Sequence, residues 1–197
     1  MAKLFNNDTI GKSYQEQLGK EHHGSKWGTT GAKYAGRDIV ELLETRPYIN
    51  SVLDFGAGKG TMGEFIENWS LEVGGRPIEW TNYDPAIPEY NQLPDRQFDL
   101  VLSTDVLEHV EPEKLPQVIK TLTSLTGKVL YSDIACYPTG KVFGEGPYKG
   151  QDLHLIVEVP NWWRFQFQSY CPLQELVFRS TEKSNGKTRC MMIHERV

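Results

Sequence analysis

The chain has 197 residues, a formal net charge of −5 at pH 7 and a pI of about 5.6. This length predicts a single domain, residues 1–197, with room for a sizeable apolar core. The acidic balance excludes a global basic field that would attract nucleic acid. No stretch approaches the roughly 20 apolar residues of a membrane span, so we expect no membrane partner.

The cysteines and the N-terminus indicate the cellular compartment. Cys136, Cys171 and Cys190 are widely spaced and odd in number, which is typical of reduced thiols and not of a disulfide framework or zinc site. The N-terminus has no apolar signal-peptide core. We therefore expect a cytoplasmic protein.

Residues 1–33 are polar and rich in glycine, and we expect an N-terminal arm that can act as a lid. After the arm, expected helices alternate with expected strands. The expected helices span residues 32–45, 61–69, 112–125 and 160–170, and the expected strands span 51–54, 78–83, 98–103, 128–133, 173–179 and 189–195.

Three local patterns define the fold class. Residues 98–103 are mostly apolar, as expected of a strand buried on both faces. Strands that alternate with helices predict a parallel sheet with right-handed crossovers. Asn185-Gly186 between the last two strands predicts a hairpin. The sequence therefore predicts an α/β fold whose sheet is mostly parallel and ends in a C-terminal antiparallel hairpin.

The most informative motif is Asp54-Phe-Gly-Ala-Gly-Lys-Gly60, which lies between an expected strand and an expected helix. Glycine permits positive φ and removes the Cβ that would block a ligand. A dinucleotide fingerprint would need a third glycine where Thr61 stands, and a P-loop would need Ser or Thr directly after Lys59. What remains is a loop that lets the backbone approach a nucleotide-like ligand without a pyrophosphate.

Two later segments point to the same sheet edge. Asp84 ends the second expected strand, 30 residues after Asp54, where an acid can accept hydrogen bonds from ribose hydroxyls. The third expected strand is followed closely by a second acid, in the run Phe98-Asp-Leu-Val-Leu-Ser-Thr-Asp-Val-Leu-Glu-His-Val110. Because ligands lie at the carboxyl ends of parallel strands, these segments should border one crevice.

Together these motifs resemble class I S-adenosylmethionine (SAM)-dependent methyltransferases, by motif over residues 34–135 and by topology over 173–195. The resemblance implies a three-layer Rossmann-like sheet and SAM as the cofactor, with the Asp54 carboxylate near its ammonium. The implied cofactor-binding residues are Trp27, Asp54, Gly56, Gly58, Gly60, Asp84, Pro85, Thr104, Asp105 and Val106.

One departure from the family is large. Family members usually place a helix and a third strand after the ribose-binding acid, but here only residues 85–92 separate Asp84 from Leu93. Eight residues with two prolines are too short for a crossover. We expect the third strand and its helix to be missing or vestigial. The second strand would then be a sheet edge, to which another copy of the chain could pair.

The acceptor side is expected in residues 136–172 and the arm. His154 is the favoured general base, because the pKa of histidine lies near neutrality. Asp105 and His109 are the other candidate catalytic residues, and His22-His23 in the arm is an alternative base. Along the sequence, His, Cys, Asp and Glu show no metal-ligand spacing, so we expect no metal. The aromatic group at 162–170 either stacks an acceptor or packs on the sheet.

Methyl transfer mainly requires that acceptor and methyl be held in line, so the sequence names few obligatory residues. We expect a methyltransferase that acts on a small molecule. One alternative is a nucleic-acid or protein methyltransferase, and a second is a SAM-binding protein without transfer activity. The local basic strip that would serve the first alternative comprises Lys26, Lys33, Arg37, Lys141, Lys149 and Arg164.

Overall fold

The computed structural model describes residues 8–22 and 28–197, and these form a six-stranded sheet in the order β2-β1-β3-β4-β6-β5. Neighbours among the first four strands run parallel, whereas β6 runs antiparallel to both β4 and β5. The strands are β1 (Ser51–Phe55), β2 (Glu79–Tyr83), β3 (Phe98–Thr104), β4 (Thr126–Ala135), β5 (Gln174–Glu182) and β6 (Thr188–Glu195). The predicted parallel sheet with a terminal antiparallel hairpin is confirmed.

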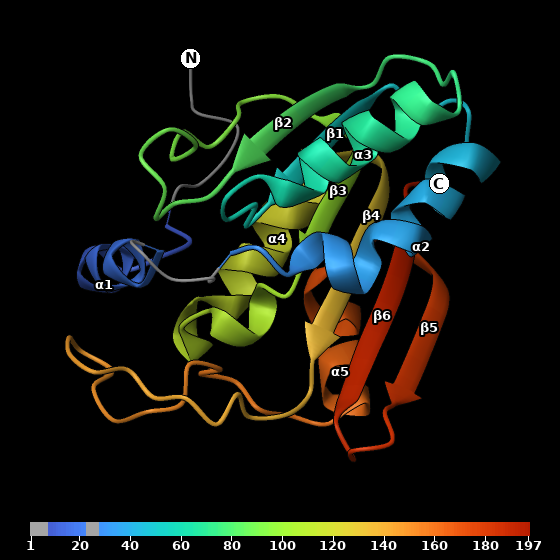
Figure 1. Cartoon of the computed structure of the whole chain (residues 1–197). Coiled ribbons are helices and arrows are strands. Elements are labelled where there is room, and N and C mark those ends of the chain that lie inside the picture. Colours follow the sequence, from blue (N-terminus) through green and yellow to red (C-terminus); the bar gives the residue numbers. More distant parts are fainter. Residues whose placement is uncertain (1–7, 23–27) are drawn as a thin grey trace.

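Helices cover both faces of the sheet, which gives three layers (Figure 1). On one face, α2 (Gly31–Thr45) and α3 (Thr61–Glu72) pack against Leu100 and Leu102 of β3. On the other face, α4 (Leu115–Leu125) and α5 (Pro160–Tyr170) pack with Val101 of the same strand. Successive side chains of a strand point to opposite faces, so β3 contributes to both cores and is apolar almost throughout.

The segment after β2 confirms the missing crossover. Residues 84–97 form only turns and bends, and β2 lies at the edge of the sheet. The segment folds back on itself, because the backbone N–H of Asp84 donates to the carbonyl of Tyr90. Whether another chain pairs with this edge stays a prediction.

The C-terminal hairpin places its second strand inside the sheet. β6 lies between β4 and β5 and is buried along most of its length, whereas β5 is largely exposed. Gly186 in the connecting turn has a φ of 76°, as the Asn-Gly signal predicted. Arg189 therefore enters the molecular interior near the carboxyl end of β4, opposite Ala135.

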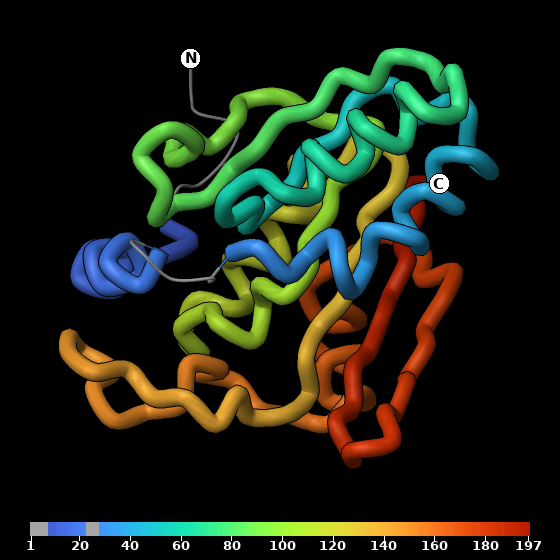
Figure 2. Tube along the Cα trace, viewed as in Figure 1, coloured from blue at the N-terminus to red at the C-terminus, as the bar shows by residue number. Residues whose placement is uncertain are grey.

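Two segments far apart in the sequence lie together beside the carboxyl ends of the parallel strands (Figure 2). They are α1 (Lys12–His22) in the arm and the irregular residues 137–159. Tyr14 packs with Phe143 and Leu153 in a small separate core. No helix in the described ranges is long and apolar enough to cross a bilayer.

The aromatic group at 162–170 belongs mainly to the core. Trp163 and Phe167 of α5 are fully buried in the cluster that joins this helix to the sheet, whereas Phe165 is 62% exposed. The interpretation of these residues as helix packing is therefore the one that the structure supports.

Trp163→Ala should lower the free energy of unfolding by about 3–5 kcal/mol, because it empties a buried aromatic site. The matched control is Phe165→Ala, two residues further along the same helix on its exposed side. It should change the free energy of unfolding by no more than about 0.5 kcal/mol. Urea denaturation measures both values. Equal costs at the two positions would contradict the packing of α5.

Candidate functional site

A pocket of about 480 Å³ lies at the carboxyl ends of β1, β2 and β3. Its walls come from these strand ends, from α1, from the start of α2 and from residues 137–154. The predicted site residues that line it are Asp54, Gly56, Gly58, Asp84, Pro85, Thr104, Asp105, Val106, His109 and His154. The fold thus brings together nearly all of the residues that the motifs indicated.

The loop after β1 needs glycine at two positions, because other parts of the chain approach it closely there. The backbone N–H groups of Gly56 and Ala57 both donate to the carbonyl of Tyr83, at 2.7 and 3.0 Å. Gly56 has a φ of 82°, and a Cβ there would collide with the side chain of Val106. Gly58 has a φ of 53°, and its Cβ would lie 2.5 Å from Cα of Gly28. A larger residue at either position would therefore displace Val106 or the Gly28 backbone, both of which line the pocket.

Two acids flank the glycine loop. Asp84 accepts hydrogen bonds from the backbone N–H groups of Gly58 and Ala86, each at 2.9 Å. Asp54 is 2% exposed, and burial, with the neighbouring Asp84 charge, raises its pKa from 3.8 to about 7. An uncompensated buried carboxylate is costly, so this end of the pocket favours a positively charged group.

A buried ion-pair network forms the middle of the site. Asp105 has a φ of 61°, and its Oδ1 and Oδ2 accept hydrogen bonds from Arg189 (2.8 Å) and Thr30 (3.0 Å). Arg189 also donates to Asp133 at 3.0 Å and lies 4.4 Å from the ring of Tyr34. Burial opposes ionisation, but the Arg189 charge holds the pKa of Asp105 below its usual range.

Two histidines and a glutamate lie beside Asp105. The Nδ1 of His154 lies 2.6 Å from the carbonyl of Tyr137, and that of His109 lies 2.7 Å from the carbonyl of Leu153. A carbonyl only accepts, so each Nδ1 carries the proton. In the neutral ring, Nε2 then holds the lone pair. Burial lowers the pKa of both rings, that of His109 to about 4, so both are neutral at pH 7.

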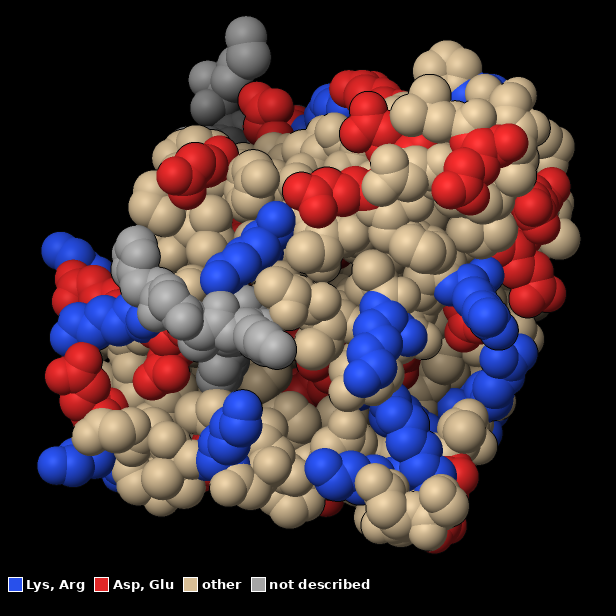
Figure 3. Space-filling view, in the orientation of Figure 1, with Lys and Arg blue, Asp and Glu red and all other residues tan. Residues whose placement is uncertain are grey.

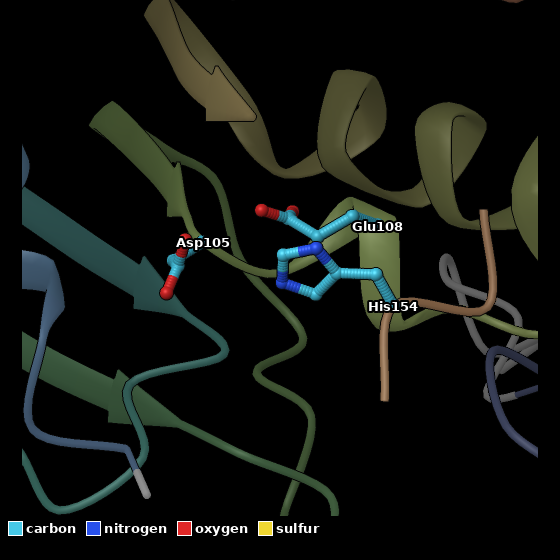
Figure 4. Close-up of side chains that lie close together, drawn as sticks. All are labelled: Asp105, Glu108 and His154. Atoms are coloured by element: carbon cyan, nitrogen blue, oxygen red, sulfur yellow. The ribbon is translucent and has the colours of Figure 1, made fainter. Parts of the chain in front are cut away.

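Glu108 is fully buried, and its carboxyl group lies close to the His154 ring (Figure 4). Its Oε1 accepts a hydrogen bond from the backbone N–H of Ala135 at 2.7 Å, while Oε2 has no hydrogen-bond partner within the described residues. Burial raises the pKa of Glu108 well above its usual range, and the nearby Asp105 adds to the effect.

The arm makes hydrogen bonds at both ends of the pocket. The amide of Gln15 donates to the carbonyl of Pro85 at 2.5 Å, and the hydroxyl of Tyr14 donates to the carbonyl of His109 at 2.6 Å. The backbone N–H of Lys59 also donates to the carbonyl of Gly28 at 2.9 Å. Residues of the arm are therefore bonded to both the glycine loop and the histidine end.

The structure does not place all of the predicted residues at the pocket. Trp27, His23 and Lys26 fall outside the described residues. Gly60 caps α3 and does not line the pocket, whereas His22 does.

The predicted basic strip is not continuous. Arg37 lies on α2 and Arg164 on α5, which cover opposite faces of the sheet, and Arg164 is paired with Glu175. Lys141 and Lys187, in contrast, line the pocket. In Figure 3, Lys and Arg side chains gather over the lower part of this face and acids over the upper part. The positive charge near the pocket is thus local.

Sequence reasoning missed Arg189, Thr30 and Tyr34 as parts of the site. Arg189 looks like the exposed start of a terminal strand, and only the antiparallel register of β6 reveals that it meets Asp133 and Asp105. A charged residue directly before the apolar run Cys-Met-Met-Ile was the one available signal.

Comparison with known proteins supports the fold. Residues 27–176 match the sequence profile of a family described as a methyltransferase domain. A sequence comparison with curated proteins finds no match.

Solved structures of similar fold include two methyltransferases. One is 1,6-didemethyltoxoflavin-N1-methyltransferase from Burkholderia thailandensis, with bound 1,6-didemethyltoxoflavin and S-adenosylhomocysteine (SAH). It is 15% identical with a TM-score of 0.60, and the match covers 93% of this chain and 89% of that one. The other is magnesium protoporphyrin IX methyltransferase from Synechocystis with bound SAH. It is 17% identical with a TM-score of 0.59, and the match covers 98% of this chain and all (100%) of that one. At this identity the likeness establishes the fold.

Asp54→Asn should change how stability depends on pH. The folded pKa of about 7 exceeds the ordinary 3.8, so folded wild-type protein binds this proton more tightly than the unfolded chain. Its free energy of unfolding therefore falls as the pH rises through this interval, and the variant lacks that contribution. Relative to wild type, the variant should gain about 2 kcal/mol between pH 5.5 and pH 8 in denaturant unfolding. Parallel pH profiles would contradict the buried, proton-binding state of Asp54.

Gly58→Ala should disrupt the contact between the glycine loop and residue 28. Its Cβ would overlap the Gly28 backbone, so the arm segment must move, and we expect at least a tenfold loss of SAH affinity by calorimetry. Gly74→Ala is the matched control, since Gly74 also has positive φ (64°) but nothing within 4 Å of its Cβ. The control should lose about 1 kcal/mol of stability and keep its affinity. Equal affinities for both variants would show that this approach does not shape the site.

Proposed function

Because the chain belongs to the family of methyltransferase domains, we propose that it uses SAM to methylate a small-molecule acceptor. One observation carries the proposal: Asp54, Gly58 and Asp84 lie at one end of a pocket whose other end holds Asp105 and His154. When bound, SAM supplies a methyl group on a positively charged sulfonium. This chain's residues bind and orient the two reactants and exclude water.

The residues at the glycine end fit SAM. Asp54 offers a buried carboxylate to the ammonium of the methionine part. Each oxygen of Asp84 accepts one backbone N–H and keeps further lone pairs, which can meet the ribose hydroxyls. Glycine at 56 and 58 lets Val106 and the Gly28 backbone, which also line the pocket, pack directly on the loop at this end. We assign the cofactor to the predicted residues that line the pocket, which are Asp54, Gly56, Gly58, Asp84, Pro85, Thr104, Asp105 and Val106.

The acceptor end fits a nucleophile that must lose a proton. His154 is neutral, is held by Tyr137 through Nδ1, and its ring lies with Nε2 toward Asp105 (Figure 4). Such a ring can accept a proton from a hydroxyl or an amine. His109 packs edge-on against it, with ring centroids 4.7 Å apart. We assign acceptor activation to His154, with Asp105 and His109 as its neighbours.

A small acceptor is favoured by the size of the pocket. About 480 Å³ must accommodate both the cofactor and the reacting group, and α1 and residues 137–154 form part of the wall. The two solved relatives are named for low-molecular-weight acceptors, a toxoflavin precursor and a magnesium porphyrin. The alternative of a nucleic-acid substrate lacks a continuous basic strip on the described residues.

Calorimetry with SAH, followed by transfer of a labelled methyl group from SAM into a metabolite extract, tests the proposal. We expect saturable SAH binding and label in a small product. Binding without transfer to any acceptor would favour a SAM-binding protein that lacks transfer activity, and label in nucleic acid or protein would identify a macromolecular acceptor. Failure to bind either SAM or SAH would contradict the function itself.

Asp84→Ala should weaken SAH binding by about 10- to 100-fold, because it removes hydrogen bonds to a charged group and releases the N–H of Gly58. Asp95→Ala, an exposed acid in the same irregular segment, is the matched control and should bind SAH as the wild type does. Equal affinity of the Asp84 variant and the control would remove Asp84 from the cofactor site.

A further inference from the structure

Three potential metal ligands meet at the acceptor end of the pocket. Asp105 follows β3, Glu108 lies in the short 3-10 helix η1 (Leu107–His109), and His154 comes from the irregular segment after β4. One ligand atom from each lies within 4.8 Å of the others, and Figure 4 shows the side chains converging. Sequence spacing could not indicate this group, because 46 positions separate Glu108 from His154.

Each of the three side chains is held in place by at least one hydrogen bond to a neighbouring group. Glu108 receives the N–H of Ala135 on Oε1, and His154 donates from Nδ1 to Tyr137. Asp105 is held by Arg189 and Thr30, yet each of its oxygens retains a free lone pair. Partners of this kind orient the ligands of protein metal sites and fix the histidine tautomer.

One carboxyl oxygen of Glu108, in the group formed with Asp105 and His154, has no hydrogen-bond partner among the described residues. This atom is Oε2, and it is buried in a residue with 0% exposure. Leaving a buried acceptor unpaired costs about 1–3 kcal/mol, more when the group is charged, so such an atom calls for a partner.

The local charge also favours a cation. The carboxyl groups of Asp105, Glu108 and Asp133 surround the single guanidinium of Arg189, which bonds to the two aspartates. Carboxyl groups bind a cation in their ionised form, and in that form three negative charges face the one positive charge of Arg189, a net of −2. A divalent cation among Asp105, Glu108 and His154 would neutralise this excess.

We propose that Asp105, Glu108 and His154 bind a divalent cation at the acceptor end of the pocket, with an open position toward the acceptor. Two carboxylates and one imidazole favour Mn²⁺, Co²⁺ or Zn²⁺ over Ca²⁺, which takes six to eight oxygen ligands. Three protein ligands with an open position are typical of catalytic metal sites.

The consequence for the acceptor rests on the proposed methyltransferase function. A cation at this position would bind an acceptor hydroxyl and lower its pKa, so that the proton passes to water. The acceptor class would then be a hydroxyl compound, methylated on oxygen. In the cation-bound protein, His154 would help activate the acceptor as a ligand of the cation, in place of the general-base role proposed for it without the cation.

Titration of the full chain with Co²⁺ tests the site directly, because bound Co²⁺ absorbs visible light. The wild type should bind one equivalent. Glu108→Gln, which keeps the side-chain shape and the bond from Ala135, should lower Co²⁺ affinity at least tenfold. His194→Gln is the matched control, since His194 is a buried histidine stacked on Phe167 at the far end of β6, and it should bind Co²⁺ as the wild type does.

SAH calorimetry on the same samples separates the two proposals and verifies folding. Wild-type protein that binds SAH but no Co²⁺ would overturn the metal site and leave the proposed function standing. Wild-type protein that does not bind SAH would overturn the proposed function, whatever the Co²⁺ result. If Glu108→Gln does not fold, His154→Gln removes a ligand contributed by the other segment and should likewise lower Co²⁺ affinity. Full Co²⁺ affinity in either folded variant would place the cation elsewhere and overturn the inference.

Discussion

The buried guanidinium of Arg189 is the interaction on which the site depends. It joins Asp133 of β4 to Asp105 beyond the end of β3, and it lies against the ring of Tyr34 from α2. These bonds hold Asp105 at a φ of 61°, a conformation that is strained for a residue with a side chain. Removing one partner of a buried ion pair strongly destabilises a protein, so this end of the pocket depends on the register of β6, which places Arg189 opposite the end of β4.

The pocket itself has two chemically different ends. The glycine end combines a tightly packed glycine loop with buried acid and suits a cationic, ribose-bearing ligand. The other end combines Asp105, Glu108 and neutral His154, and suits an acceptor that must give up a proton. The arm is bonded to both ends through Gln15 and Tyr14. One helix of the arm is therefore in contact with both ends of the pocket.

Much of the sheet and of the glycine end follows from local sequence, because strand ends in an alternating fold place Asp54, Asp84 and Thr104 on one edge. The segment between Asp84 and Leu93 is too short for a crossover, so its absence could also be predicted from the sequence. Boundaries were less certain: Pro116 lies within the first residues of α4, so the helix begins at Leu115 after a 3-10 turn. Arg189 was missed, because its partners lie 84 and 56 positions away and meet it only through strand register.

On the proposed function, one pocket directs a SAM methyl group at the cluster around His154. A crystal structure with bound SAH would show this arrangement. We expect the ribose hydroxyls on Asp84, the ammonium toward Asp54, and the sulfur facing the space between Asp105 and His154. SAH bound with its ribose away from Asp84, or with its sulfur turned away from Asp105 and His154, would contradict the account.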